Sequence, residues 1–437
     1  MYWLYSALLA IVLLMGSPYW LWQMLRHGKY RRGLGERLGR LPLRLRRPAA
    51  PVIWVHAVSV GEVLAVSRLI EDLKSRFPKH SIVVSTTTDT GQKLAGQRFG
   101  EENVFYFPLD LPFAIQPYLR LLRPRLVIIA ETEFWPNFLR LAHRSGARIA
   151  IVNGRISDRS LRGYRRYRRV LVPILSQIDI FLAQSPEDAR RLHEIGAPAE
   201  RVENTGNLKF DLELPPPPEI VAHLRATFES EHAGPIIVCG STMEGEEPLL
   251  LRTFEIVLGR YPKAVMILAP RHPERFEPVA QLIQKLRLTL YRRSTKTGET
   301  LAGAVLLLDS VGELAAIYAL ADIAFVGGSL VPSGGHNILE PAQYGVATVI
   351  GHHTENFRDM VEVFQVQKAI RVVGPAELPL VFMELLADSD LRADLGSRAA
   401  GARRSQMGAT EKTIQALGKL LSPAQRGANA KTATSKE

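Results

Sequence analysis

Residues 52–76 read VIWVHAVSVGEVLAVSRLIEDLKSR, and this stretch decides the fold class. Its first seven residues form a β-branched apolar run, which predicts a buried strand, and the remainder repeats apolar residues at helical spacing. The same unit recurs downstream, with further strands predicted at 82–88, 126–130, 148–152 and 178–183. Strands that alternate with helices at this spacing indicate an α/β domain with a parallel sheet and helices on both of its faces.

The alternation stops at residues 213–220, ELPPPPEI, because four successive prolines form a stiff extended spacer. It then restarts, with strands predicted at 236–239, 264–268, 304–308, 323–326 and 346–350. We therefore predict two Rossmann-like domains, residues 51–212 and 221–422, that face one another across a cleft. The polar residues 423–437 are predicted to be a disordered tail. Ligands of such folds bind at the carboxyl ends of the strands, so functional side chains should follow the strands.

The N-terminal segment has the composition of a membrane anchor. Residues 1–25 contain no charged side chain, and the apolar run is long enough to span a bilayer. Aromatic residues flank it, and the basic segment 26–50 follows, so the positive-inside rule places the later domains in the cytoplasm. We favour a single membrane-crossing helix. A helix lying flat in the interface stays open as an alternative, because Gly16, Ser17 and Pro18 interrupt the run.

Charge and cysteine content narrow the possible partners. The formal net charge is +12 over 437 residues, which favours nucleic acid, acidic lipid or a phosphorylated substrate. The single Cys239 excludes a disulfide within the chain and a cysteine-based metal site. Because it lies inside an apolar run, we interpret it as a small buried hydrophobic residue rather than a catalytic thiol.

Two carboxylate motifs follow strands of the first domain. Glu62 stands at the start of a helix, where it is either a capping carboxylate or a general base. Glu131 and Glu133 come directly after the strand at 126–130, and neighbouring carboxylates can shift one another's pKa. The hydroxyls of 86–88 are interpreted as helix caps.

Basic residues form a further cluster in this domain. Residues 162–169, RGYRRYRR, follow the motif at 153–157 that contains Arg155. Arginines interleaved with tyrosines can contact lipid phosphates or stack on bases. We interpret this run as a membrane-proximal anion site rather than a nucleic-acid site.

The second domain carries small and cationic residues after its strands. Gly240 and Ser241 end one strand, where backbone N–H groups can approach a phosphate, and Arg271 ends the next. Residues 326–345, VGGSLVPSGGHNILEPAQYG, place His336 and Glu340 one helical turn apart. That spacing allows a metal pair, but a nucleotide held against bare backbone explains the glycines as well.

These motifs together resemble a known family. The set VHAVSVGE, TTTDTG, ETEFWPN, NGRIS, GNLKFD, GST, APRHPERF and GGSLVPSGGHNILEPA is similar to that of the 3-deoxy-D-manno-octulosonic acid (Kdo) transferases, from the N-terminal anchor to residue 360. The resemblance implies a GT-B glycosyltransferase of the inner membrane that moves Kdo from CMP-Kdo to a lipid A precursor (lipid IVA). It implies Glu62 as general base and Glu131 and Glu133 on the acceptor side, where we also expect Arg155. The residues it assigns to the cytidine nucleotide are Gly240, Ser241, Arg271, His272, Gly328, His336, Asn337 and Glu340.

In the expected reaction an acceptor oxygen attacks the anomeric carbon of Kdo and CMP leaves from the opposite side, which predicts inversion, and we expect no cofactor. The Asp-x-Asp sequence at 388–390 is interpreted as a helix start, so we predict no catalytic metal, and we expect anionic lipid but no nucleic acid among the partners. Two rivals stay open: a GT-B transferase or epimerase acting on a UDP-sugar, and a non-catalytic membrane-tethered binder of anionic lipid or RNA.

Overall fold

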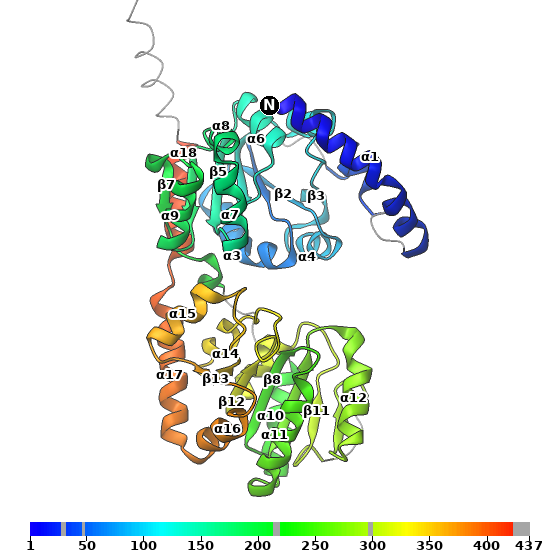
Figure 1. Ribbon diagram of the computed structural model, residues 1–437, viewed down its shortest axis with the longest axis vertical. Coiled ribbons are helices and arrows are strands. Elements are labelled where there is room, and N and C mark those ends of the chain that lie inside the picture. The colour runs from blue at the N-terminus through cyan, green and yellow to red at the C-terminus, as the bar shows by residue number, and fades with distance from the viewer. Residues whose placement is uncertain (28–31, 46–48, 213–218, 296–299, 423–437) are drawn as a thin grey trace, which may run out of the picture. The chain divides into compact units, whose positions relative to one another are not determined.

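The computed structural model describes residues 1–27, 32–45, 49–212, 219–295 and 300–422. The chain divides into two compact units, here called unit 1 (Met1–Leu212 with Met407–Glu437) and unit 2 (Glu213–Gln406), and each is built around its own sheet (Figure 1). Most of the predicted proline linker, the predicted tail at 423–437, and parts of the basic segment after the first helix lie outside the described residues.

Unit 1 contains a seven-stranded parallel sheet in the order β3-β2-β1-β4-β5-β6-β7. This order places the first strand inside the sheet and reverses the direction of winding between β1 and β4, as in a Rossmann fold. The strands are β1 (Val52–His56), β2 (Ser81–Thr86), β3 (Val104–Tyr106), β4 (Pro124–Ala130), β5 (Arg148–Gly154), β6 (Ile180–Ala183) and β7 (Val202–Asn204).

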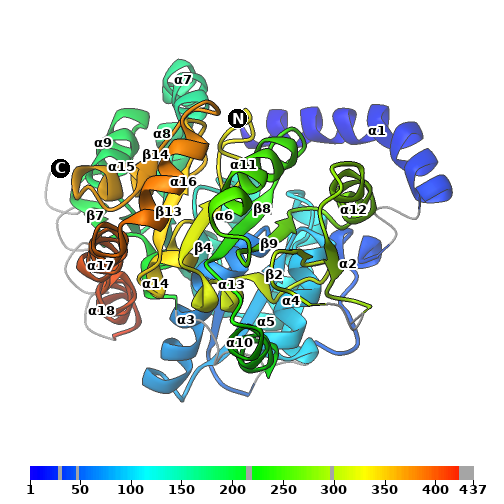
Figure 2. The ribbon, with the colours of Figure 1, turned by 90° about the horizontal axis from the view of Figure 1, so that it is seen from below.

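Helices cover both faces of this sheet (Figure 2). Successive residues of β1 show why, because Trp54 packs into the core on one face with Phe105 and Phe138, while Ile53 packs into the core on the other face with Leu69. The α-helices of unit 1 are α1 (Tyr2–His27), α2 (Leu34–Arg37), α3 (Val60–Arg76), α4 (Asp89–Phe99), α5 (Pro112–Leu122), α6 (Pro136–Arg144), α7 (Asp158–Arg166), α8 (Arg168–Leu175), α9 (Pro186–Ile195) and α18 (Ala409–Leu421). Short 3₁₀ turns complete it: η1 (Glu101–Asn103), η2 (Ala199–Arg201) and η3 (Leu208–Asp211).

Unit 2 repeats the plan with a parallel sheet in the order β10-β11-β9-β8-β12-β13-β14. Its strands are β8 (Ile236–Thr242), β9 (Val265–Pro270), β10 (Leu290–Arg292), β11 (Val305–Leu307), β12 (Ile323–Val326), β13 (Ala347–Ile350) and β14 (Arg371–Val372). Its helices are α10 (Glu219–Glu231), α11 (Glu247–Arg260), α12 (Phe276–Lys285), α13 (Leu314–Ile317), α14 (Leu339–Gln343), α15 (Arg358–Val366), α16 (Leu378–Ala387) and α17 (Ser389–Ser405), with η4 (Pro273–Arg275) and η5 (Tyr318–Leu320). Cys239 lies in the core of β8, where burial raises the pKa of its thiol, so its interpretation as a small hydrophobic residue is confirmed.

Every strand that we predicted from an apolar run is present, and the fold class is confirmed. The strands that the sequence analysis missed are the short ones near the sheet edges: β3, β7, β10 and β14. Three of these four lack a buried residue, so they carry no apolar run for a sequence pattern to detect.

The structure corrects the predicted end of the second domain. We expected residues 221–422 to form one domain, but α18 belongs to unit 1, where Ile414 and Leu417 enter the core beside Leu69. The carboxylate of Asp211 accepts the N–H groups of Gly408 (2.7 Å) and Thr410 (2.5 Å), and so caps the first turn of α18 from a distant part of the sequence.

The replacement Asp211→Ala should release α18 from unit 1. Loss of a cap costs about 1–2 kcal/mol, and the buried N–H groups would be left without an acceptor. We expect a lower free energy of unfolding in urea, with faster amide exchange concentrated in 409–421. The matched control is Asp388→Ala, which removes the cap of α17. If both variants accelerate exchange in the same helix, the assignment of α18 to unit 1 is wrong.

Candidate active site

Glu62 lies at the carboxyl end of β1, in the first turn of α3, and its side chain is 8% exposed. Its carboxylate accepts the backbone N–H of Val58 (2.8 Å) and the hydroxyl of Ser59 (3.0 Å), while the Ser59 oxygen accepts the N–H of Glu62 (3.4 Å). This reciprocal arrangement is a variant of the capping box. The capping interpretation is therefore correct, but it does not exclude a chemical role.

The electrostatic surroundings of Glu62 favour a proton acceptor. Burial raises the pKa of this carboxyl to about 7, the hydrogen bond from Val58 opposes the rise, and the charges of Glu131 and Glu133 add to it. Strands β1 and β4 are neighbours in the sheet, which is why the carboxylates at their ends interact. A carboxyl with a pKa near neutrality is well matched to general-base catalysis.

Glu131 and Glu133 follow β4 in different environments. The Nζ of Lys209 lies 3.4 Å from Oε1 of Glu131, and the backbone N–H of Glu131 donates to the carbonyl of Val152 (2.9 Å). Burial, together with the charge of Glu131, raises the pKa of Glu133. The two carboxyls therefore differ in their electrostatic surroundings, because Glu131 forms an ion pair with Lys209 and Glu133 is partly desolvated.

Residues from β5 and η3 complete this side of the site. The hydroxyl of Thr132 donates to the carbonyl of Arg155 (2.5 Å), which joins the loops after β4 and β5. Asn153 is buried, and its side-chain oxygen accepts the N–H of Leu208 (3.0 Å). Lys209 was not predicted from the sequence as a site residue. The GNLKFD motif gave the available signal, but nothing in the sequence showed that Lys209 would reach Glu131.

Three residues at the carboxyl ends of strands have left-handed backbone conformations although they are not glycine. They are Glu131 (φ 56°), Asn153 (φ 53°) and Ser241 (φ 54°). Such conformations are uncommon for residues with a side chain and gather at functional sites, where the surrounding structure holds them. Each of the three lies in a motif that the sequence analysis singled out.

The glycines of unit 2 are required by close packing. A Cβ atom on Gly240 would lie 2.1 Å from the hydroxyl of Tyr318, and one on Gly327 would lie 2.5 Å from the carbonyl oxygen of Ser241. Gly328 has φ 71°, and a Cβ there would lie 2.5 Å from His336. These glycines therefore let β8, β12 and the following loop approach one another.

Glu246 fixes the loop after β12, and its role was not predicted. The side chain is fully buried, and its two oxygens accept the backbone N–H groups of Met243 (2.8 Å), Gly328 (2.7 Å), Ser329 (2.9 Å) and Leu330 (2.9 Å). We expected this glycine loop to let a nucleotide lie against bare backbone. The three N–H groups of 328–330 are already bonded to Glu246, so these three are not available to a phosphate.

His336, Asn337 and Glu340 lie around this loop. The Nδ1 of His336 is 2.8 Å from the carbonyl oxygen of Gly327, and burial lowers the pKa of its ring, which favours the neutral imidazole. Glu340 accepts the side-chain amide of Asn337 (3.3 Å), and burial raises its pKa to about 7, opposed by this hydrogen bond and by the charge of Arg271. Arg271 follows β9, and its own N–H donates to the carbonyl of Thr242 (2.9 Å).

The predicted helix that carries both His336 and Glu340 is wrong. Gly334 and Gly335 have positive φ angles, and α14 begins only at Leu339 and is five residues long, so His336 precedes the helix. Within the described residues there is no group of three His, Cys, Asp or Glu side chains that could hold a metal ion. The Asp-x-Asp interpretation is correct, because the Asp388 carboxylate accepts the N–H groups of Asp390 and Leu391 at the start of α17.

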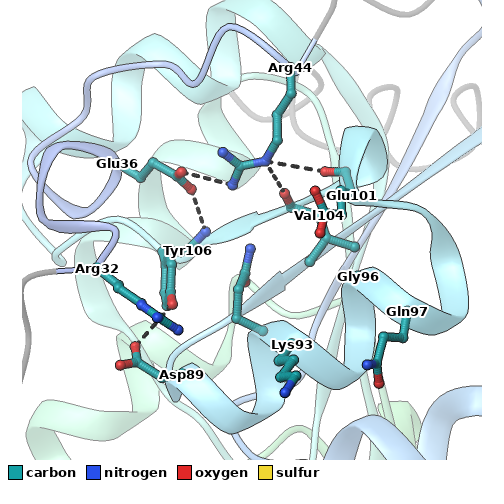
Figure 3. Close-up of a pocket in the computed structure, with 11 residues that line it drawn as sticks. Arg32, Glu36, Arg44, Asp89, Lys93, Gly96, Gln97, Glu101, Val104 and Tyr106 are labelled. Carbon is teal, nitrogen blue, oxygen red and sulfur yellow. Dashed lines mark hydrogen bonds and ion pairs between the residues drawn. The ribbon is translucent and has the colours of Figure 1, made fainter.

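A separate polar cavity of about 390 Å³ lies in unit 1 where the segment after α1 packs on α4 and β3 (Figure 3). Glu36 bridges it, accepting from Arg44 (2.7 Å) and from the N–H of Tyr106 (2.9 Å), and the Tyr106 hydroxyl donates to Asp89 (2.9 Å). The remaining lining residues are Arg32, Gln92, Lys93, Gly96, Gln97, Glu101 and Val104. Acidic and basic groups alternate around this cavity, so it has no strong preference for a charged ligand.

Solved structures share this architecture. A glycosyltransferase from Rickettsia africae matches 86% of this chain and all of its own, with a TM-score of 0.58 and 13% identity. A UDP-GlcNAc 2-epimerase from Neisseria meningitidis matches 84% of this chain and all of its own, with a TM-score of 0.57 and 14% identity. At this level of identity the likeness shows the fold alone. The fold is that of the GT-B glycosyltransferases, with two Rossmann-like units.

Sequence comparison identifies the family. Residues 32–212 match the family described as 3-Deoxy-D-manno-octulosonic-acid transferase (kdotransferase). The 3-deoxy-D-manno-octulosonic acid transferase of Haemophilus influenzae is 35% identical over 395 residues, 89% of this chain and 91% of that protein. The protein of the same name from Bordetella pertussis is 34% identical over 91% of this chain and 94% of its own. The chain belongs to the Kdo transferase family and is a glycosyltransferase.

Enzymatic activity should depend on pH through Glu62. With a pKa of about 7, the carboxyl is protonated below neutrality and cannot accept a proton, so kcat/KM should fall about tenfold per pH unit below 7. The replacement Glu62→Gln should lower kcat by roughly 10²–10⁴ and abolish this acidic limb. Steady-state rates between pH 5 and 9 measure both effects. An unchanged acidic limb in the variant would exclude Glu62 as the titrating base.

The replacement Glu246→Gln should loosen the loop after β12. The amide has one acceptor oxygen where the carboxylate has two, so some buried N–H groups would lose charge-assisted hydrogen bonds, at a cost of about 2–4 kcal/mol. We expect a lower urea midpoint together with a higher KM for the donor. The matched control is Glu244→Gln, an exposed residue paired with Arg275, which should change stability by less than about 0.5 kcal/mol. Equal effects of the two replacements would contradict the role of Glu246.

Proposed function

We propose that this Kdo transferase moves Kdo from CMP-Kdo to a lipid A precursor (lipid IVA), with inversion at the anomeric carbon and without a metal ion. The observation that carries the proposal is the buried Glu62, whose pKa is about 7 beside Glu131 and Glu133, in a chain of the Kdo transferase family. Unit 1 supplies the base and the acceptor-side groups. Unit 2 holds the cytidine nucleotide.

In the proposed reaction Glu62 removes the proton from an acceptor sugar hydroxyl. The resulting oxygen attacks the anomeric carbon of Kdo, the bond from that carbon to the phosphate oxygen breaks, and CMP leaves from the opposite face. The hydrogen bonds from Val58 and Ser59 fix the direction of the carboxylate without occupying all of its lone pairs. One position therefore stays available for the incoming hydroxyl.

The departing nucleotide carries the developing negative charge. Because Glu246 occupies the N–H groups of 328–330, we assign the stabilisation of the phosphate to the guanidinium of Arg271, with His272 and the backbone around Gly240 and Ser241. Glu340 and Asn337 are assigned to the ribose, since a carboxylate that is partly buried and hydrogen-bonded suits a sugar hydroxyl. His336 is assigned to the nucleotide as a neutral imidazole.

On the acceptor side, Glu131 and Glu133 bind the hydroxyl groups of the acceptor sugar, with Arg155 and Lys209 as nearby cations. The ion pair of Lys209 with Glu131 makes the two carboxyls electrostatically different. The negative charge of Glu131 is partly neutralised by Lys209, whereas Glu133 is partly buried beside the charge of Glu131. We therefore expect Glu133 to have the greater affinity for a hydroxyl donor. We assign the dominant role in binding to Glu133 on this ground.

Membrane attachment supports a lipid acceptor. One helix of the described residues, Tyr2–Trp20 with a mean hydropathy of 1.4, is long and apolar enough to cross a membrane, which is consistent with an anchor. We propose attachment at the cytoplasmic face of the inner membrane, where anionic lipid attracts the basic residues that follow α1.

The test is product analysis of the full-length enzyme supplied with CMP-Kdo and lipid IVA. Mass spectrometry should show products heavier by one or more Kdo units, and a chelator should leave the rate unchanged. Glu62→Gln should give little product, whereas the matched Glu71→Gln, exposed on the same helix, should keep full activity. In parallel, CMP-Kdo and UDP-sugars are compared for thermal stabilisation. Stabilisation by a UDP-sugar without Kdo transfer would favour the UDP-sugar alternative and overturn the proposal.

A further inference from the structure

Helix α1 presents one long exposed apolar face. The exposed side chains on it are Trp3, Leu4, Leu8, Ile11, Val12, Leu14, Met15, Tyr19 and Trp22. Between Tyr2 and Trp20, the less exposed positions of the helix are Tyr2, Tyr5, Ser6, Leu9, Leu13, Gly16, Ser17 and Trp20, which recur at intervals of three and four. This spacing describes a stripe along one side of the helix, so α1 has an inner side and an outer side although nearly all of it is apolar.

The first turns of α1 are attached to the folded part of unit 1. Tyr2 packs on the core cluster, the Arg140 guanidinium lies 4.5 Å from the centre of its ring, and its hydroxyl accepts a hydrogen bond from the Gln177 amide. The Asn137 amide donates to the hydroxyl of Ser6 (2.9 Å). In Figure 1 this end of α1 lies beside α6.

Asp110 strengthens this attachment. Its buried carboxylate accepts the N–H groups of Asn137 (3.0 Å) and Phe138 (2.7 Å) at the start of α6, and it also accepts a hydrogen bond from Tyr5. One carboxylate therefore joins the N-terminal turn of α6 to α1. Burial raises the pKa of Asp110 to about 6, in keeping with a group withdrawn from water.

The other end of α1 is tethered to the same unit. Six residues separate His27 from α2, so the end of α1 lies within about 25 Å of α2. Helix α2 is held on the edge of the sheet, since Glu36 accepts the N–H of Tyr106 (2.9 Å), the Tyr118 hydroxyl donates to the Glu36 carbonyl (3.0 Å), and the Arg37 guanidinium lies 4.6 Å from the Tyr106 ring centre.

Attachment of the first turns of α1 to unit 1 is incompatible with a helix that crosses the bilayer. The 26 residues of α1 are about 39 Å long, and the hydrocarbon core is about 30 Å thick. If α1 crossed, Tyr2 would lie on the far side of the membrane from α2, and its partners Asp110, Asn137 and Arg140 could not reach it without entering hydrocarbon. Charged side chains and irregular backbone are not found exposed to lipid within the hydrocarbon core.

We propose that α1 lies in the plane of one leaflet of an anionic phospholipid membrane, with its exposed apolar face in the lipid and its first turns docked on unit 1. The proposal deepens the membrane attachment in the proposed function and rests on it. It selects the interfacial alternative left open by the sequence. The alternative, in which α1 crosses the membrane, is tested by the first experiment below.

Charge near the docked end specifies an anionic surface. Helix α8 contacts α6 and leads into Gln177, the partner of Tyr2, so it lies next to the start of α1. Its exposed residues include the apolar Val170 and Val172 together with Arg169, and the preceding α7 exposes Arg162 and Arg166. An apolar surface bordered by arginines matches the boundary between acyl chains and acidic headgroups.

The first experiment determines the side of the membrane on which the N-terminus lies. An epitope tag is added before Met1 of the full-length protein, and a second version carries the tag after Glu437. In spheroplasts, neither tag should be accessible to an antibody until the inner membrane is permeabilised. A crossing helix predicts that the N-terminal tag alone is accessible in intact spheroplasts, and this result would overturn the proposal whether or not the enzyme transfers Kdo.

The second experiment tests docking in native membranes with a short bis-maleimide. In a Cys239→Ala background, Tyr2→Cys with Gln177→Cys should be cross-linked within one chain, whereas the matched pair Tyr2→Cys with Lys412→Cys should not, because Lys412 lies on α18, away from α1 (Figures 1 and 2). Absence of the first cross-link in a variant that keeps the parent's unfolding midpoint would overturn the docked arrangement.

The third experiment tests the lipid class. Flotation of the purified protein at low salt should be greater with vesicles that contain phosphatidylglycerol than with phosphatidylcholine alone. The triple variant Arg162→Gln, Arg166→Gln and Arg169→Gln should lose most of that difference and keep its cross-link. Equal flotation of the parent with both vesicles would contradict an anionic surface as the partner.

Discussion

Buried backbone N–H groups at the carboxyl ends of parallel strands need acceptors, and both units meet this requirement with a glutamate after their first strand. Glu62 follows β1 and Glu246 follows β8, each next to the start of a helix. Glu246 accepts four backbone N–H groups, and Glu62 accepts one N–H and one hydroxyl. The number of donors decides the role. A carboxylate saturated by fixed donors holds a loop, whereas one with lone pairs to spare, a raised pKa and two acidic neighbours can accept a proton.

This difference explains what the sequence could and could not predict. The strands with apolar runs, the two-unit organisation and the position of Glu62 follow from local patterns, because burial on both faces of a parallel sheet demands continuous apolar strands. The pairing of Lys209 with Glu131 and the clamp of Glu246 on 328–330 join residues 78 or more positions apart. Only the folded topology brings such residues together. The glycines of 327–328 were interpreted as letting a nucleotide lie against bare backbone, and the structure adds a packing reason that the sequence did not show, because Cβ atoms there would collide with Ser241 and His336.

The misplaced end of the second domain has a similar cause. The amphipathic pattern of α18 predicts a helix, yet it does not specify which sheet receives its apolar face. That choice depends on Asp211, nearly two hundred positions earlier, whose carboxylate provides the acceptor for the first turn. A domain boundary read from a change in composition cannot detect a chain that returns to the first unit after completing the second.

In the proposed arrangement, the attachment of α1 connects the membrane with the acceptor side of the site through one short segment. Glu131 and Glu133 are followed directly by Trp135 and by α6, and the first turn of α6 is bonded both to Asp110 and to α1. The acceptor that we propose is lipid-borne and remains in its leaflet during the reaction, so the groups proposed to bind its sugar must be held at a fixed depth relative to the membrane surface. A crossing helix joined by a flexible segment would fix the distance of unit 1 from the membrane only loosely. A helix in the leaflet, docked beside the loop of Glu131 and Glu133, fixes that depth and the orientation of the unit together, because rotation of unit 1 would lift one end of α1 out of the lipid.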